Sequence, residues 1–493
     1  MKIKALFTSF FIFSVLLGYS QKPSADKKEP YSIKIKVKGI NSGEAYLAHY
    51  FGYNQQVIKD TAKIASDGSF LFEGNEKLPK GLYLITVSKN KYFDLVIGET
   101  QMSIETDTLN FAENTKITGS KENKIFYEYQ KAMSQYFTTM RKMRDEYKDS
   151  KDVKIEERLK KVQNEVDQFQ EKWEKENEGT LVVKFIKSSK DPIVPEYKLP
   201  MLNKQDTLNM RKYQYEYYKS HYLDNVDFKE EILVRTPFLQ RKLEKYFEDL
   251  VIQQNDSLSK EADIVLSKIP KEKSLEGIRK YVIYKITNQY ETPKVVGTDG
   301  VFIHMAEKYY INEPNLWDTS TVTRMKERVQ ILKPLMVGKV VPEMYLTDTS
   351  GNEMQLTKIK GKYIVMFIYD PECGHCKESA PKLVKMLPKL KEMGATVFAP
   401  SIERDKKKWM KFISEFKTQS FINGIDVHIN PNTKAEEYYT DFKKTYDVYS
   451  TPVTYILDKD KKIIAKRLPV ENVEDFLNFY ERNEKAKLAN TKK

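Results

Sequence analysis

Apolar and polar positions alternate with the period of a β-strand between residues 31 and 118. The stretch YSIKIKVKG is the clearest case, and the shorter runs GLYLITV, FDLVIG and MSIETD follow it. A turn is indicated at Asp67 and Gly68, and further turn signals recur at the spacing of about eight to twelve residues that all-β domains show. We therefore expect an antiparallel β-sandwich or barrel over residues 31–118.

From residue 119 the apolar positions take the spacing of an α-helix instead. Charged residues fill the other positions here and in the later segments IEERLKKVQNEVDQFQEKWEKEN, PFLQRKLEKYFEDLVIQQ and EKSLEGIRKYVIYKITNQY. Side chains three or four positions apart share one face of a helix. We expect an α-helical domain over residues 119–332, in which these stripes form a core rather than a ligand groove. The first stripe consists of Phe126, Tyr129, Met133, Tyr136, Met140, Met143 and Tyr147.

Strand and helix patterns alternate after residue 334. The run YIVMFIY at 363–369 is apolar throughout, as a strand buried on both faces requires. Helical spacing follows up to Gly394. The rest of the domain predicts, in order, a strand (ATVFAP), a helix (KKKWMKFISEF), a strand (GIDVHI), a helix (AEEYYTDFKKTY), a hairpin (VTYILDKDKKIIAKR) and a last helix (VEDFLNFYERN). We expect an α/β domain with a mixed sheet over residues 334–484.

The first twenty residues have the pattern of a secretory signal peptide. Lys2 and Lys4 precede an apolar stretch, and small residues follow it up to Ser20. The apolar centre is shorter than the ~20 residues that a membrane-spanning helix needs. We expect residues 1–20 to be a signal peptide cleaved after Ser20, and the mature protein to be exported, periplasmic and soluble, with no stable membrane span.

Composition indicates a folded protein without a nucleic-acid surface. Of the 493 residues, 40% are hydrophobic and 12% aromatic, which excludes wholesale disorder. The net charge of +13 is a small surplus among 83 basic and 70 acidic side chains that are interleaved along the chain. Because the charges are interleaved rather than clustered, we expect no nucleic-acid partner. His221 and His304 have no partner at metal-ligand spacing, and we expect no metal site.

The only two cysteines are Cys373 and Cys376, with Gly374 and His375 between them. Zinc would need about four ligands, and a second cysteine pair is absent from the sequence. Covalent haem attachment would need a histidine directly after the second cysteine, where Lys377 stands. An inert disulfide is the remaining alternative, but a bridge closing so small a loop restrains little of the unfolded chain. The pattern therefore favours a redox-active dithiol.

The predicted elements place Cys373 where a buried strand ends and a helix begins. Free backbone N–H groups at a helix N-terminus favour a thiolate and lower its pKa. Cys376 lies one turn later on the same side, so the first sulfur can attack a disulfide and the second can resolve the mixed disulfide. His375 adds positive charge that stabilises the thiolate, whereas Glu372 opposes it. We expect a lowered pKa for Cys373 and not for Cys376.

Residues from about 338 to 483 resemble the thioredoxin-fold domain of exported, TlpA/ResA-like thiol-disulfide oxidoreductases. The matching features are the apolar strand before the Cys-Gly-His-Cys sequence, the helix that carries Pro381, and the stretch YDVYSTPVTYILDKDKKII. In that stretch Thr451 and Pro452 resemble the family's cis-proline dipeptide, which implies that they lie against the cysteine pair and bind substrate. The two preceding regions loosely resemble uncharacterised modules found ahead of such domains.

Several positions depart from these families. Glu372 replaces the tryptophan that usually precedes the first cysteine, and Phe367 replaces the buried acid of thioredoxins. Ser379 stands where TlpA-like proteins have an acid, with Glu378 beside it, so the acceptor of the Cys376 proton stays open. The residues that peroxiredoxins place ahead of their reactive cysteine are absent, since Met366 and Asp370 occupy those positions.

These observations support a thiol-disulfide oxidoreductase that acts on protein thiols and disulfides in the cell envelope. Cys373 attacks and Cys376 resolves, Thr451 and Pro452 bind substrate, and Glu372, Gly374, His375 and Glu378 tune the motif. We expect no cofactor besides the redox-active disulfide Cys373–Cys376. An upstream redox partner would return this pair to its starting redox state after each reaction. One alternative is an envelope partner-binding protein with a vestigial or sensory thioredoxin domain, and another is peroxide reduction, which the departures disfavour.

Overall fold

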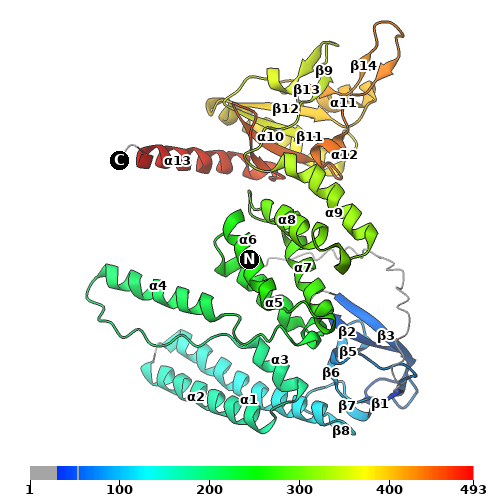
Figure 1. The fold of residues 1–493 in the computed structure, drawn as a ribbon, viewed down its shortest axis with the longest axis vertical. Coiled ribbons are helices and arrows are strands. Elements are labelled where there is room, and N and C mark those ends of the chain that lie inside the picture. The colour runs from blue at the N-terminus through cyan, green and yellow to red at the C-terminus, as the bar shows by residue number, and fades with distance from the viewer. Residues whose placement is uncertain (1–29, 53–54, 151, 492–493) are drawn as a thin grey trace. The chain divides into compact units, whose positions relative to one another are not determined.

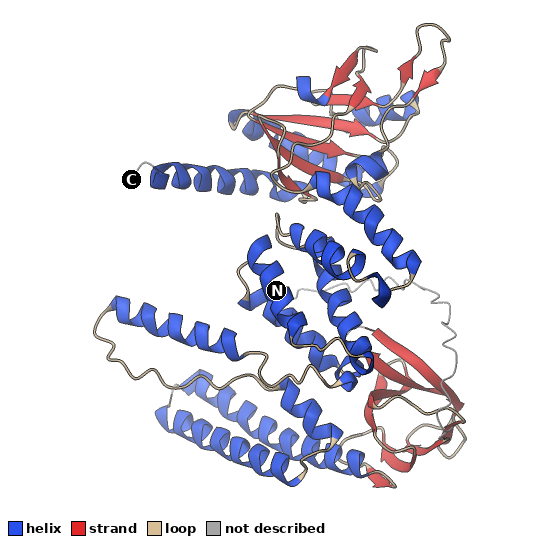
Figure 2. Cartoon of the chain, viewed as in Figure 1, coloured by secondary structure: helices blue, strands red, loops and turns tan. Residues whose placement is uncertain are grey.

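The computed structural model describes residues 30–52, 55–150 and 152–491 (Figure 1). The predicted signal peptide lies outside the described residues. The described residues form two compact units, one within residues 30–50 and 56–184, and the other within residues 51–55 and 185–491. Strands occupy the N-terminal and C-terminal parts of the sequence, and the part between them is helical (Figure 2).

Two four-stranded sheets form the β-sandwich of the first unit. Their inward-facing residues, among them Ile33, Leu47, Phe72 and Leu95, share one buried core. β1 pairs in parallel with β7, whereas the pairs β1–β4, β7–β8, β2–β5 and β5–β6 are antiparallel. The first sheet has the order β4 (Ser69–Gly74), β1 (Tyr31–Lys38), β7 (Gln101–Asp107) and β8 (Lys116–Thr118), and the second has β3 (Gln55–Lys63), β2 (Glu44–Phe51), β5 (Gly81–Ser88) and β6 (Lys91–Ile97).

Two long helices complete the first unit, and α3 (Leu181–Ser189) begins there. The predicted apolar stripe of α1 (Lys121–Ser150) packs against α2 (Val153–Glu176), where Met133, Met140 and Val166 are buried together. The stripe is therefore a packing surface. The side chain of Asn123 pairs with the backbone of Val96 on β6, which fixes the start of α1 on the sheet.

Helices make up the first half of the second unit. Their core contains Leu258, Val265, Ile283 and Phe302, all fully or nearly fully buried. A π-helical turn, η2 (Tyr246–Leu250), continues α5, so one predicted helix consists of two segments. The helices are α4 (Lys204–His221), η1 (Glu231–Arg235), α5 (Pro237–Lys245), α6 (Asn255–Ser267), η3 (Lys273–Leu275), α7 (Glu276–Glu291), α8 (Gly300–Met305), η4 (Ala306–Ile311), η5 (Pro314–Leu316), α9 (Thr319–Leu332) and η6 (Lys333–Leu335).

A seven-stranded mixed sheet forms the centre of the C-terminal domain. The buried run predicted at 363–369 is the central strand β11 (Tyr363–Ile368), parallel to β12 (Ala395–Ser401) and antiparallel to β16 (Val453–Asp458). The sheet order is β10 (Glu353–Gln355), β9 (Tyr345–Thr347), β13 (Ile422–Ile425), β12, β11, β16 and β17 (Ile463–Lys466).

Helices cover both faces of this sheet. Val365 and Phe367 of β11 pack in one core with side chains of α10 (Gly374–Glu392), α11 (Lys406–Glu415) and α13 (Val473–Thr491). Ile364 and Met366 point to the opposite core, to which α12 (Phe442–Tyr446) contributes. The short helices η7 (Leu356–Lys358) and η8 (Val470–Asn472) complete the domain. The predicted fold class, with a β-rich, a helical and a thioredoxin-like α/β region, is confirmed.

The helix predicted for AEEYYTDFKKTY is wrong in its first half. Glu436–Glu437 form a short strand, β15, paired with β14 (His428–Ile429), and only α12 is helical. The backbone N–H groups of Tyr439 and Thr440 donate to the Asp426 carboxylate, which holds them outside a helix. Across the described ranges, no helix is long and apolar enough to cross a membrane.

Candidate active site

A turn after strand β11 presents Cys373 at the start of α10. The Asp370 side chain accepts a hydrogen bond from the Glu372 backbone at 2.8 Å, and the Asp370 carbonyl accepts one from the Cys373 backbone at 3.1 Å. Cys373 is the residue that caps α10, with extended backbone angles, and the Lys377 N–H donates to its carbonyl. The turn thus points the Cys373 side chain toward the free N–H groups of the first helical turn.

The two sulfurs lie in different environments and are not bonded to each other. Cys373 is half-buried at the rim of the domain. Cys376 has an exposed fraction of 0% and packs in the core with Phe367, Tyr369 and Ala380. An incoming disulfide can therefore reach Cys373 first.

These environments move the two thiol pKa values in opposite directions. Partial burial acts to raise the pKa of Cys373, but hydrogen bonds to its sulfur from Thr451, Cys376 and the His375 backbone outweigh burial and lower the pKa. Burial raises the pKa of Cys376 to about 12. These directions agree with the expectation from the sequence of a lowered pKa for Cys373 and not for Cys376.

Thr451 and Pro452 lie beside the outer thiol, in the loop between α12 and β16. The Cys373 thiol donates to the Thr451 carbonyl at 3.2 Å, and the peptide bond between Thr451 and Pro452 is cis. Both residues are half-buried, so part of their surface faces solvent next to the sulfur.

The other predicted tuning residues lie on the solvent side of the motif. Gly374, His375 and Glu378 are exposed, and His375 Nδ1 is 3.8 Å from Glu378 Oε2. The exposed Glu378 carboxylate thus lies next to His375, whereas Cys376 is buried. Glu372 is also exposed, directly before the outer thiol.

Lys408 of α11 is a residue of the site that sequence reasoning missed. Its ammonium nitrogen lies 2.7 Å from Glu372 Oε2 and 3.5 Å from Glu403 Oε2. It therefore offsets the negative charge that Glu372 brings to the Cys373 thiolate. Lys408 stands in the run KKKW, 36 positions after Glu372, so nothing in the sequence separates it from its neighbours.

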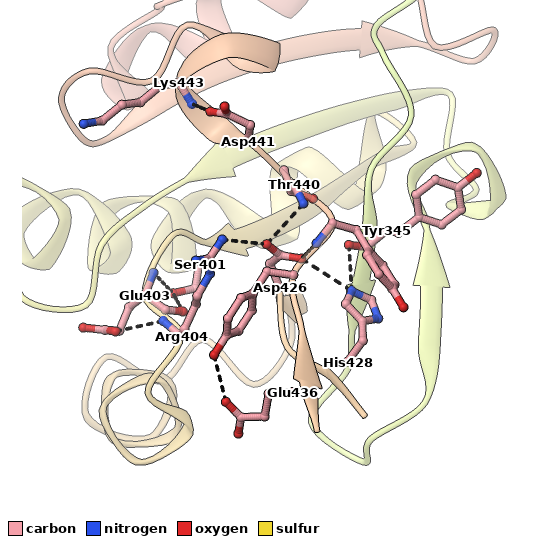
Figure 3. Close-up of polar contacts among 12 residues, drawn as sticks. Tyr345, Ser401, Glu403, Arg404, Asp426, His428, Glu436, Thr440, Asp441 and Lys443 are labelled. Atoms are coloured by element: carbon pink, nitrogen blue, oxygen red, sulfur yellow. Dashed lines mark hydrogen bonds and ion pairs between the residues drawn. The ribbon is translucent and has the colours of Figure 1, made fainter. Parts of the chain in front are cut away.

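A second polar cluster surrounds the buried carboxylate of Asp426, at the end of β13 (Figure 3). Besides the two backbone N–H groups already named, Arg404 donates to it at 3.3 Å. His428 Nε2 lies 3.5 Å from the carboxylate and 3.2 Å from the Tyr345 carbonyl (Figure 3). The cluster fixes the chain that leads into α12. Among the residues that the structure describes, no group of three or more His, Cys, Asp or Glu side chains is placed to hold a metal ion.

Family models match three successive parts of the chain. Residues 31–126 match a domain of unknown function (DUF4369), residues 154–334 match a second domain of unknown function (DUF5106), and residues 337–466 match the AhpC/TSA family. The first two models thus fall on the β-rich and helical regions, and the third falls on the domain that carries the cysteines.

Curated relatives match the same C-terminal domain. The thiol-disulfide oxidoreductase ResA of Bacillus cereus is 24% identical over 157 residues, which are 32% of this chain and 80% of that protein. ResA of Bacillus subtilis is 21% identical over 145 residues, 29% of this chain and 74% of that protein.

Similar solved structures include a domain of a possible thiol-disulfide isomerase from Cytophaga hutchinsonii. It is 43% identical, with a TM-score of 0.28, and the match covers 31% of this chain and 98% of that one. A thioredoxin-like protein from Bacteroides caccae is 19% identical, with a TM-score of 0.45, over 58% of this chain and 99% of that one.

The family model, the curated relatives and the fold agree on the class. The protein is a thiol-disulfide oxidoreductase whose C-terminal domain is thioredoxin-like. This domain is similar in sequence to ResA, and the two matches to domains of unknown function precede it in the chain.

Proposed function

We propose that the protein exchanges thiols and disulfides with other exported proteins through Cys373 and Cys376. The observation that carries the proposal is the contrast between the two sulfurs. Cys373 is accessible with a lowered pKa, and Cys376, one helical turn behind it, is buried with a raised pKa. An attacking thiol needs access and thiolate character, while a resolving thiol needs only to reach the first sulfur.

In the reductive direction, the Cys373 thiolate attacks one sulfur of a substrate disulfide. A bond forms between Cys373 and that sulfur, and the other substrate sulfur leaves as a thiolate and takes a proton. Cys376 then loses its proton and attacks Cys373, which releases the second substrate thiol and leaves the Cys373–Cys376 disulfide. Two electrons pass from the dithiol to the substrate, so the reaction needs no bound cofactor.

A dithiol of an upstream redox partner would return the enzyme disulfide to the reduced form. The oxidative direction runs through the same steps in reverse, with a disulfide partner upstream. The pattern of the first twenty residues supports export. We therefore expect the reaction in the periplasm, where disulfides persist. The intact mass of the exported protein tests cleavage after Ser20.

Trapping of mixed disulfides tests the assigned roles. The variant Cys376→Ser stops the cycle after the first step and should accumulate covalent adducts with exported proteins, whereas Cys373→Ser should accumulate none. Non-reducing electrophoresis of both variants, expressed in the native compartment, gives the readout, and mass spectrometry identifies the adducts. Equal trapping by both variants would contradict the roles. No trapping by either would favour a partner-binding protein with a vestigial or sensory thioredoxin domain.

A further inference from the structure

An arginine of the helical region reaches the loop that carries the cis proline. Arg328 of α9 donates through Nη1 to Asp447 Oδ1 at 2.7 Å and through Nε to Glu291 Oε1 of α7 at 2.8 Å. The Arg328 side chain is 17% exposed. A guanidinium held at both ends by carboxylates has one defined orientation.

Asp447 is the buried anchor of this loop. It caps the end of α12 with left-handed backbone angles (φ of +55°) and is 2% exposed. Its second oxygen accepts from Arg467 Nη2 at 2.6 Å, and its carbonyl accepts from the same nitrogen at 2.7 Å. Each carboxylate oxygen therefore binds a different arginine, and Arg328 is the one that comes from the helical region.

The segment that follows Asp447 is fixed at both ends and exposed between them. Val448 is buried in the core, and β16 begins at the buried Val453. Between these two points, Tyr449 is 60% exposed, with the Arg328 guanidinium 5.6 Å from the centre of its ring. Two residues further on, the Thr451 carbonyl accepts from the Cys373 thiol. A shift of the Asp447 anchor would therefore move the residues that face an incoming chain.

A second ion pair joins the same two regions. Lys466 at the end of β17 lies 2.7 Å from Asp299, directly before α8, and both side chains are largely buried. Lys466 is the neighbour of Arg467 in the sequence. The Lys466–Asp299 ion pair thus links the helical region to the sheet independently of Arg328. A substitution of Arg328 alone leaves this ion pair in place.

We propose that Arg328 is a positioning residue, through which the helical region sets the geometry of the loop Tyr449–Pro452 for a polypeptide substrate. The proposal rests on the proposed function. A polypeptide disulfide must lay its backbone along this loop to bring its sulfur to Cys373, so its reaction depends on the position of the loop. A low-mass disulfide needs only access to the Cys373 sulfur.

The test compares Arg328→Met with Lys326→Met, which removes one positive charge from an exposed position of the same helix. The full chain is assayed with insulin as the protein disulfide and with an aromatic low-mass disulfide, both with a dithiol as the final reductant. For Arg328→Met we expect a fall of about tenfold in kcat/KM for insulin, carried mainly by KM, and less than about twofold for the low-mass disulfide. Lys326→Met should match the unaltered protein with both substrates.

Hydrogen exchange of residues 448–451 provides a readout that does not need activity. Exchange there should be faster in Arg328→Met, while exchange in β11 and β12 stays unchanged. Equal losses with both substrates, or unchanged insulin kinetics, would overturn the proposal. If the unaltered protein reduces neither substrate, the proposed function fails. In that case hydrogen exchange still tests the anchoring role, and unchanged exchange of the loop in Arg328→Met would overturn it. Should Arg328→Met not fold, Arg328→Lys, which keeps the charge but loses the two-ended contact, is measured in the same way.

Discussion

The thiol of Cys373 and the backbone carbonyl of Thr451 are 3.2 Å apart, and the thiol is the donor. A carbonyl oxygen can accept from the neutral thiol but cannot donate to the thiolate. Ionisation therefore removes this hydrogen bond. The thiolate is stabilised instead by hydrogen bonds from donors at the start of α10 and from the Thr451 side chain.

The first prediction concerns the pH dependence of thiol alkylation. Because the pKa of Cys373 is lowered, the alkylation rate of Cys376→Ser should reach half its maximum below pH ~8.5, the midpoint of an ordinary cysteine. In Cys373→Ser the remaining thiol has a raised pKa and is buried, so its rate should stay low up to strongly alkaline pH. Alkylation of each variant between pH 5 and 10, followed by mass, makes the comparison. Similar midpoints for both thiols would contradict the assigned environments.

The second prediction concerns the charge beside the outer thiol. Lys408→Met leaves the Glu372 carboxylate without its nearest cation, so the Cys373 pKa should rise and alkylation at pH 7 should slow by about two- to threefold. Glu372→Gln should shift the pKa in the opposite direction. Lys411→Met, an exposed lysine on the same helix, is the matched control. Both effects should shrink in 1 M salt, because the groups are exposed. Identical behaviour of Lys408→Met and Lys411→Met would remove Lys408 from the site.

The third prediction concerns the buried carboxylate of Asp426. Asp426→Ala leaves the N–H groups of Tyr439 and Thr440 without their acceptor, which should cost about 2–4 kcal/mol of local stability. Hydrogen exchange in β13 and in residues 436–446 of the full chain measures this loss. Asp405→Ala removes an exposed acceptor at the start of α11 and should cost less. Unchanged exchange of residues 436–446 in Asp426→Ala would show that the Asp426 carboxylate does not stabilise them.

The fourth prediction concerns Gly374. A Cβ added there meets no atom within 4 Å, and the backbone is in the ordinary helical region. Gly374→Ala should therefore be accommodated and should stabilise the start of α10 by a few tenths to about 1 kcal/mol, since alanine loses less backbone entropy. Exchange of the first turn of α10 and the Cys373 alkylation rate are the measurements. A large loss of Cys373 reactivity would show that the motif needs glycine for a reason other than space.

Hydrophobic periodicity was sufficient to predict the central strand β11, the helix that follows Cys373 and the strand that starts after Pro452. Each of these depends on neighbours in the sequence, such as the unbroken apolar run before the turn at Asp370. The strand β15 was missed for the opposite reason. It pairs with β14, and the backbone N–H of Tyr439, two residues after β15, donates to Asp426, which lies 13 residues earlier. A helical pattern of apolar residues carries no sign of these contacts.

The same distinction applies to the candidate site. The cysteines and the Thr451–Pro452 pair stand in recognisable motifs, so the sequence could predict them as candidates, and the structure brings them together. Lys408 approaches Glu372 from a separate helix, and Arg328 binds Asp447 across 119 positions of the chain. Both are ordinary basic residues in basic surroundings, and only the tertiary fold distinguishes them from the other 81 lysines and arginines among the 83.

The passage from α9 to the thioredoxin-like domain contains no flexible tether. Leu332 and Leu335 are buried, and Leu335 belongs to the core that lines one face of the sheet. In many two-domain enzymes a flexible linker joins the catalytic domain to the rest of the protein, and the linker length sets the effective concentration of the catalytic domain at its target. Here the connection to α9 is packed into the core, so it does not act as such a linker for the domain that carries Cys373. A substrate must come to the sulfur, and the loop that it meets there includes Tyr449, whose ring lies 5.6 Å from the guanidinium of Arg328 on α9.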